Sequence, residues 1–130
     1  MTAVETLRGR APAQSPELIP LLEKAAEAAK KLRDGAVEAV SGIVSRGGTI
    51  DGAAFEREQR AAHGLAWVAT YAAAIEQLAS YAKRMEGEGR FGEMERLLAQ
   101  IGTAEYLSQL FGGVMMSQGE IGRASCRERV

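Results

Sequence analysis

The sequence has 130 residues, of which 46% are apolar and 25% charged, and it holds three prolines and one cysteine. This composition is typical of one small globular domain and excludes a collagen-like or disulfide-stapled scaffold. The formal net charge of -1 provides no strong long-range field, so we expect neither nucleic acid nor an anionic membrane as a partner.

Residues 1–14 have no helical period and are expected to form a disordered N-terminus. They lack the apolar run of a secretory signal. The longest apolar run of the chain, residues 64–75, is also too short, because a bilayer span needs roughly 20 residues. The sequence therefore predicts a soluble, cytoplasmic protein.

A first amphipathic helix is predicted over residues 17–45. Ser15 and Pro16 directly before it are typical of a helix start, since one offers a capping oxygen and the other needs no N–H partner. Gly47 and Gly48 follow the last apolar position, and glycine can cap a helix in the left-handed conformation. The apolar positions at helical spacing are Leu18, Leu22, Ala25, Ala29, Leu32, Ala36 and Ile43.

A second and longer helix is predicted over residues 52–87, with Asp51 as its N-cap. At 1.5 Å per residue such a helix is about 50 Å long. Two adjoining apolar seams run along it, which is typical of a central helix packed between neighbours. One seam is Trp67, Tyr71, Ala74, Leu78, Tyr81 and Met85, and the other is Leu65, Val68, Ala72, Ile75 and Ala79.

A third amphipathic helix is predicted over residues 92–111. Because the two connections are short, consecutive helices are expected to be antiparallel neighbours. The sequence therefore predicts an all-α fold without strands, an antiparallel three-helix bundle with a long central helix, in one domain over residues 15–113. The apolar face expected on the third helix is Met94, Leu97, Ile101, Ala104, Leu107 and Phe111.

The end of the chain differs in character from the rest. Residues 114–120 are expected to begin a linker to a missing catalytic region. Residues 121–130 have no helical period and read as an in-frame translation of a common sequencing adapter. We therefore interpret the natural sequence as truncated near Glu120, and we draw no redox argument from Cys126, because it lies in this adapter-derived tail.

Gly87, Gly89 and Gly92 satisfy the pattern G-x-G-x-x-G, whose backbone amides cradle a pyrophosphate in dinucleotide-binding units. That function requires a strand before the glycines, whereas here they follow a predicted helix. Glu88 between them would also repel phosphate. The pattern therefore favours a turn between two helices over a cofactor site.

The remaining candidates for chemistry are isolated. Histidine is the usual pH-sensitive side chain of proteins, but no partner in the sequence makes His63 a ligand or a general base. Glu76 and Glu105 interrupt apolar stretches, which is more typical of a carboxylate at the edge of a seam than of a catalytic acid. Trp67, Tyr71 and Tyr81 are interpreted as core. One histidine and one cysteine cannot form a His/Cys metal cage, so we assign no catalytic, cofactor-binding or metal-binding residue.

Three segments, residues 61–71, 88–93 and 116–120, carry a family resemblance. They resemble the N-terminal helical extension of bacterial methylsuccinyl-CoA dehydrogenases, members of the acyl-CoA dehydrogenase superfamily. The similarity spans roughly residues 16–120. The matching blocks belong to a scaffold, so no catalytic position is carried over to this chain.

The resemblance implies a longer parent enzyme that holds FAD and is a homo-oligomer. In such an enzyme a carboxylate base removes the alpha proton of a CoA thioester, and the beta hydrogen leaves as hydride to the flavin. The reaction would convert methylsuccinyl-CoA to mesaconyl-CoA in the ethylmalonyl-CoA pathway. The fragment itself is expected to bind no cofactor, and its first partner would be its own missing dehydrogenase domain.

A reading from another functional class stays open. Alanine-rich amphipathic helices also suit a stand-alone helical interaction protein, such as a phasin-like coat protein of storage granules. A reading frame that continues for several hundred residues beyond Glu120 favours the enzyme, and an early stop codon favours the interaction protein.

Overall fold

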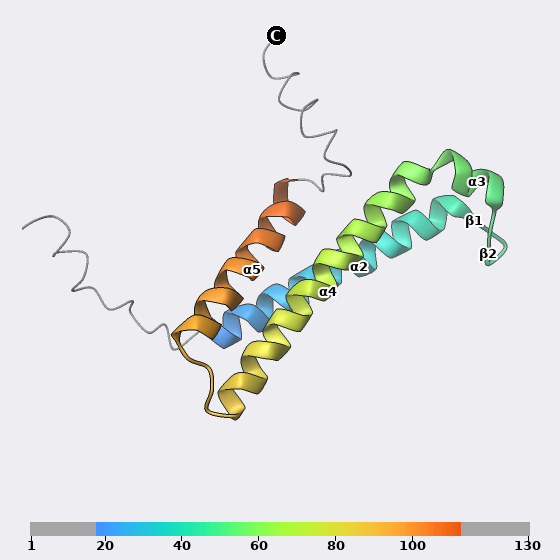
Figure 1. The fold of residues 1–130 in the computed structure, drawn as a ribbon. Coiled ribbons are helices and arrows are strands. Elements are labelled where there is room, and N and C mark those ends of the chain that lie inside the picture. The colour runs from blue at the N-terminus through green and yellow to red at the C-terminus, as the bar shows by residue number, and fades with distance from the viewer. Residues whose placement is uncertain (1–17, 113–130) are drawn as a thin grey trace, which may run out of the picture.

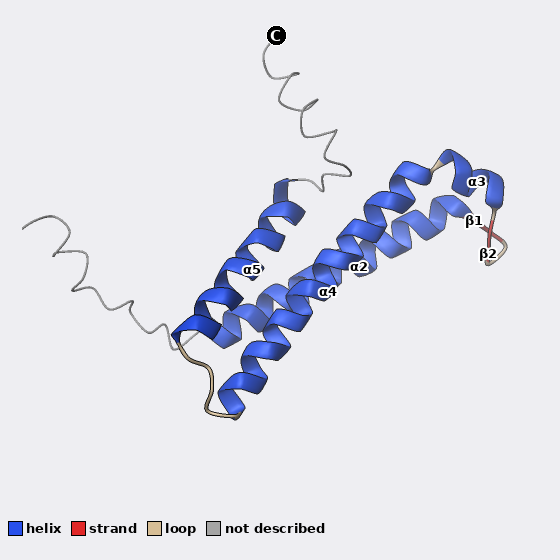
Figure 2. Ribbon diagram, viewed as in Figure 1, coloured by secondary structure: helices blue, strands red, loops and turns tan. Residues whose placement is uncertain are grey.

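The computed structural model describes residues 18–112, which are almost entirely helical (Figures 1 and 2). The prediction of an all-α bundle is confirmed. The expectations for residues 1–14, 114–120 and 121–130 lie outside the described residues. The described elements in chain order are α2 (Leu18–Val44), β1 (Ser45–Arg46), β2 (Thr49–Ile50), α3 (Gly52–Arg57), α4 (Gln59–Gly87) and α5 (Glu93–Gly112).

The long helix α4 lies at the centre of the bundle. It runs antiparallel to α2 and beside it along most of its length, and α5 then runs back antiparallel to α4 (Figure 1). α5 packs mainly on α4 and touches α2 only slightly. The bundle is therefore an α2–α4 pair with α5 added to one side.

The core of this bundle consists mostly of small side chains. One cluster joins Leu18, Ile19 and Leu22 of α2 to buried alanines of α4 and α5, and a second cluster surrounds Ile75. Alanine at these contacts lets helix axes approach toward the close end of the usual 8–10 Å range. The fully buried residues are Ala72, Ile75, Ala82 and Ala99.

The glycines after α2 form a hairpin turn rather than a helix cap, which corrects one prediction. α2 ends at Val44, and β1 and β2 pair antiparallel with Arg46 opposite Thr49. Gly47 and Gly48 have φ of 59° and 82°. Positive φ at both central residues is the requirement of the type I′ turn that closes a two-residue hairpin. The expectation of no strands therefore fails at these four paired residues.

The helix predicted over residues 52–87 is divided in two, which is a second correction. Asp51 caps the first part as expected, since its carboxylate accepts a hydrogen bond of 2.9 Å from the Ala54 backbone N–H. The chain then turns at Glu58, and α4 begins at Gln59. The turn lets α3 bury Ala54 against the end of α2. This tertiary contact overrides a local sequence that contains no helix breaker.

The orientation of α5 reverses the prediction for its apolar face. The side that packs on α4 carries Ala99, Gly102 and Thr103, and a Cβ built on Gly102 would lie only 2.9 Å from Cδ1 of Leu78. Small residues are needed there because α5 approaches α4 closely. The face predicted to be buried is instead exposed, with Ile101 at 65% and Phe111 at 96%.

Candidate functional site

The glycine pattern at residues 87–92 ends α4. Gly89 has φ of 68°, its N–H donates to the Glu86 carbonyl, and the Arg90 N–H donates 2.8 Å to the Met85 carbonyl. These two bonds are those of a Schellman motif, in which a left-handed glycine closes the helix. The interpretation as a helix turn is confirmed. The amides of Gly89 and Arg90 are engaged by this turn and do not form a phosphate cradle.

His63 belongs to a row of aromatic side chains that joins α4 to α5. The Trp67 indole N–H donates to His63 Nε2 at 3.0 Å. Trp67 stacks at 5.6 Å between ring centroids on Tyr71, which in turn lies 5.5 Å from Tyr106 of α5. The row thus leads to Tyr106 and not to Tyr81, whose ring instead lies under the Arg84 guanidinium at 5.8 Å. This arrangement supports a packing role for the row.

The two glutamates singled out in the sequence have different hydrogen-bond partners. Glu76 of α4 accepts a 3.1 Å hydrogen bond from the Arg33 guanidinium of α2. Arg33 also bonds Asp34, and these carboxylates, Asp34 foremost, raise the pKa of the guanidinium. Glu105 is exposed on α5 and accepts from Gln109 Nε2 at 3.1 Å. Among residues 18–112, the hydrogen-bond partners of these two glutamates are Arg33 and Gln109, which do not make a catalytic constellation.

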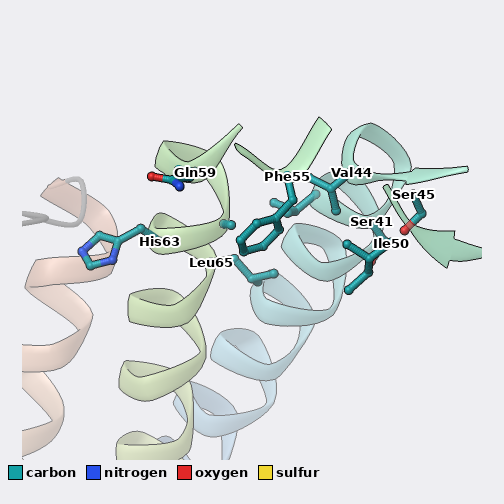
Figure 3. Close-up of a pocket in the computed structure, with 10 residues that line it drawn as sticks. Ser41, Val44, Ser45, Ile50, Phe55, Gln59, His63 and Leu65 are labelled. Carbon is teal, nitrogen blue, oxygen red and sulfur yellow. The ribbon is translucent and has the colours of Figure 1, made fainter. Parts of the chain in front are cut away.

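An apolar cleft of about 500 Å³ lies where the hairpin and α3 meet the ends of α2 and α4 (Figure 3). Phe55 and Leu65 face Val44 and Ile50 across it, whereas the His63 ring points away from these apolar side chains. The residues of the cleft are Val40, Ser41, Val44, Ser45, Ile50, Phe55, Gln59, Ala62, His63 and Leu65.

Metal and membrane sites receive no support from the described part of the chain. Over residues 18–112, no three His, Cys, Asp or Glu side chains gather closely enough to hold a metal ion. Over the same residues, no helix combines the length and the apolar character that crossing a bilayer demands.

The outward face of α5 exposes more large apolar side chains than any other described element. Large apolar side chains lie on the side of the helix opposite to its contact with α4. They recur with spacings of three and four residues, the heptad repeat by which one helix packs on another. Small residues, Ala104 and Ser108, complete this spacing, and the exposed Leu98 and Leu107 lie beside it. We call the spaced residues the α5 seam: Met94, Leu97, Ile101, Ala104, Ser108 and Phe111.

The sequence contains a signal for this exposed face. Apolar or small residues occupy both sides of α5, because Ala99, Tyr106 and Leu110 lie opposite the seam. A helix that is apolar all round is normally covered all round. The sequence prediction assigned only one apolar face and chose the one with the larger side chains.

Comparison with known proteins gives one informative match. No family model matches the chain. It is 43% identical over 107 residues to (2S)-methylsuccinyl-CoA dehydrogenase of Cereibacter sphaeroides. This chain is similar to a fragment of that dehydrogenase. The match covers 82% of the chain and 20% of the relative, so the chain spans about a fifth of the length of the protein that it resembles.

Proposed function

We propose that this chain is the N-terminal helical module of a longer FAD-dependent acyl-CoA dehydrogenase that resembles methylsuccinyl-CoA dehydrogenase. The observation that carries the proposal is the 43% identity to the curated relative, which extends over most of this chain but only a fifth of that protein. The longer enzyme would oxidise methylsuccinyl-CoA to mesaconyl-CoA and would be a cytoplasmic homo-oligomer.

The flavin of that enzyme does not fit the residues described here. A pyrophosphate group needs backbone N–H groups that are free to donate at a helix start. At the one glycine pattern of this kind, the Gly89 and Arg90 amides already donate to the carbonyls of Glu86 and Met85. We therefore assign the flavin and the acyl-CoA to the body of the longer enzyme, and assembly to this module.

The module would act by packing on the dehydrogenase body. The exposed α5 seam supports this role, because an apolar helix face in water favours association. The same exposed face also favours the second candidate, a stand-alone helical interaction protein of the phasin-like kind. The alignment with the dehydrogenase favours the first candidate.

The test is to read the native locus past the codon for Glu120. We expect an open frame of several hundred further codons in place of the adapter-like residues 121–130. A stop codon shortly after Glu120 would overturn the proposal and favour the stand-alone protein. The same read tests the adapter interpretation of the tail.

A second measurement uses the chain by itself. The purified 130-residue protein is expected to lack flavin absorbance after expression and after incubation with FAD. Copurification of a yellow protein with a flavin spectrum would contradict the assignment of the cofactor to the missing body.

A further inference from the structure

The α5 seam has the length and the geometry of a helix-docking surface. From Met94 to Phe111 it extends for about 25 Å at 1.5 Å per residue, or nearly five helical turns. Its spacings of 3, 4, 3, 4 and 3 residues keep these six residues on one line, which is the geometry of the seam in a helix pair. A partner helix could therefore pack along the whole of α5.

The charges beside the seam are of one sign. The exposed charged side chains that flank it are Glu93 and Glu105, with Gln100 between them along the helix. The one arginine of α5, Arg96, lies on the other side of the helix, with its guanidinium 5.5 Å from the centre of the Phe91 ring. The seam therefore has an acidic border.

Because of this acidic border, a second copy of α5 is a poor partner for the seam. Residues that flank the two seams of a helix pair lie next to each other and select the partner by charge. In a pair of α5 helices, the only charged residues at these flanks would be glutamates, so no attractive ion pair could form. A complementary helix would instead carry Lys or Arg beside its apolar positions.

We propose that the α5 seam docks an α-helix of the dehydrogenase body, one with an apolar heptad seam flanked by lysine or arginine. The occupant follows from the length of the relative, four fifths of which lies outside the aligned segment, together with the acidic border of the seam. This inference rests on the proposed function and adds the surface and the chemistry of the contact.

The first experiment tests the surface on the chain alone. Two synthetic helical peptides share one leucine heptad seam, and they carry lysine or glutamate at the flanking positions. We expect the lysine-flanked peptide to bind about tenfold more tightly in a calorimetric titration. Equal affinity of the two peptides, or no binding of either, would overturn the inference.

Two neighbouring substitutions separate seam docking from general charge attraction. Ile101→Glu and Gln100→Glu each add one negative charge, one within the seam and one beside it. We expect Ile101→Glu to abolish binding of the lysine-flanked peptide and Gln100→Glu to preserve or strengthen it. If both variants bind more tightly, the attraction is only electrostatic and the seam is not the docking surface.

The second experiment identifies the occupant in a full-length hybrid, in which this chain replaces the aligned segment of the Cereibacter sphaeroides enzyme. We expect Ile101→Glu to lower the unfolding midpoint of the hybrid by about 5 °C and to leave the midpoint of the separate chain unchanged. A flavin-loaded hybrid that tolerates Ile101→Glu overturns the docking inference. A folded hybrid without flavin overturns the proposed function instead.

Sedimentation of the separate chain distinguishes the rival occupant. We expect a monomer at micromolar concentration. A dimer that Ile101→Glu disperses would show that a second copy covers the seam, and would overturn the assignment to the dehydrogenase body. If the hybrid does not fold, the peptide titration decides the inference.

Discussion

α4 and α5 differ in how they bury their large apolar side chains. In α4, every large apolar side chain is at least partly covered, and Ile75 is completely covered. In α5, the large side chains of the seam face outward. The side against α4 combines the small residues Ala99 and Gly102 with the half-buried Tyr106 and Leu110. α4 is therefore covered by its neighbours on its apolar sides, whereas α5 has an inner contact that is complete and an outer face that is open.

The two faces of α5 also differ in what they require of a neighbour. The inner face fixes a short distance between helices, because Leu78 lies directly against Gly102. The outer face presents long, flexible side chains such as Met94 and Leu97, which can adapt to a partner. The inner contact is rigid, and the outer one can adapt to a partner. This combination suits a helix that joins two parts of a larger protein.

The largest expected difference in stability between α4 and α5 comes from shortening one isoleucine in each helix. Ile75→Ala removes a fully buried side chain, so we expect a loss of about 3 kcal/mol in the free energy of unfolding. Ile101→Ala, at 65% exposure, should change it by less than about 0.5 kcal/mol. Urea unfolding followed by circular dichroism measures both, and equal losses would contradict the outward orientation of the seam.

A smaller difference in stability than for the isoleucines is expected when one alanine in each helix is enlarged. Ala82 is fully buried between α2, α4 and α5, so Ala82→Leu should cost about 2 kcal/mol through overpacking. Ala104 belongs to the exposed seam, and Ala104→Leu should leave the unfolding midpoint of the chain unchanged. The same pair of unfolding curves checks the prediction, and destabilisation by Ala104→Leu would place that residue in the core.

One buried polar side chain lies in the contact between α4 and α5. Thr103 is buried, and its hydroxyl has no hydrogen-bond partner among the described residues. Thr103→Val keeps the shape and removes the unpaired hydroxyl, so we expect a gain of about 1 kcal/mol in the free energy of unfolding. Ser108→Val on the exposed seam is the control, and it should give no comparable gain in thermal unfolding.

The smallest effect is expected on the solvent face of α2. The Lys31 ammonium lies 2.8 Å from the Glu27 carboxylate, and this hydrogen bond holds the pKa of Glu27 below its ordinary value of 4.5. Because the folded pKa is lowered, the contribution of the pair is present above pH 4.5 and is lost as the pH falls through the folded pKa. NMR titration should show this shift, and Lys31→Gln should reverse it.

Much of the α2–α4 pair could be predicted from the sequence because its signals are local. Ala72, Ile75 and Ala79 lie on one seam of a regular helical repeat, and all three are buried. The Asp51 cap likewise depends only on a side chain and an N–H three residues later. Such features are set within one or two helical turns, so periodicity and capping preferences suffice to find them.

The features that the sequence prediction missed depend on contacts between elements. Gly47 and Gly48 fit both a helix cap and a hairpin turn, and the pairing of β1 with β2 selects the hairpin. The turn at Glu58 has no glycine or proline to mark it. In α5, side-chain size alone suggested that Ile101 faces inward, but the close approach at Gly102 turns it outward.

The hairpin at the other end of the bundle offers a practical attachment point. Gly47 and Gly48 are exposed, have open space around them and lie at the far end of the long helices from the α4–α5 turn (Figure 1). A cysteine in place of the neighbouring Thr49, in a chain carrying Cys126→Ser, would accept a fluorescent dye there. Energy transfer from that dye to one on the dehydrogenase body would report, in solution and in real time, whether the two parts stay joined during turnover.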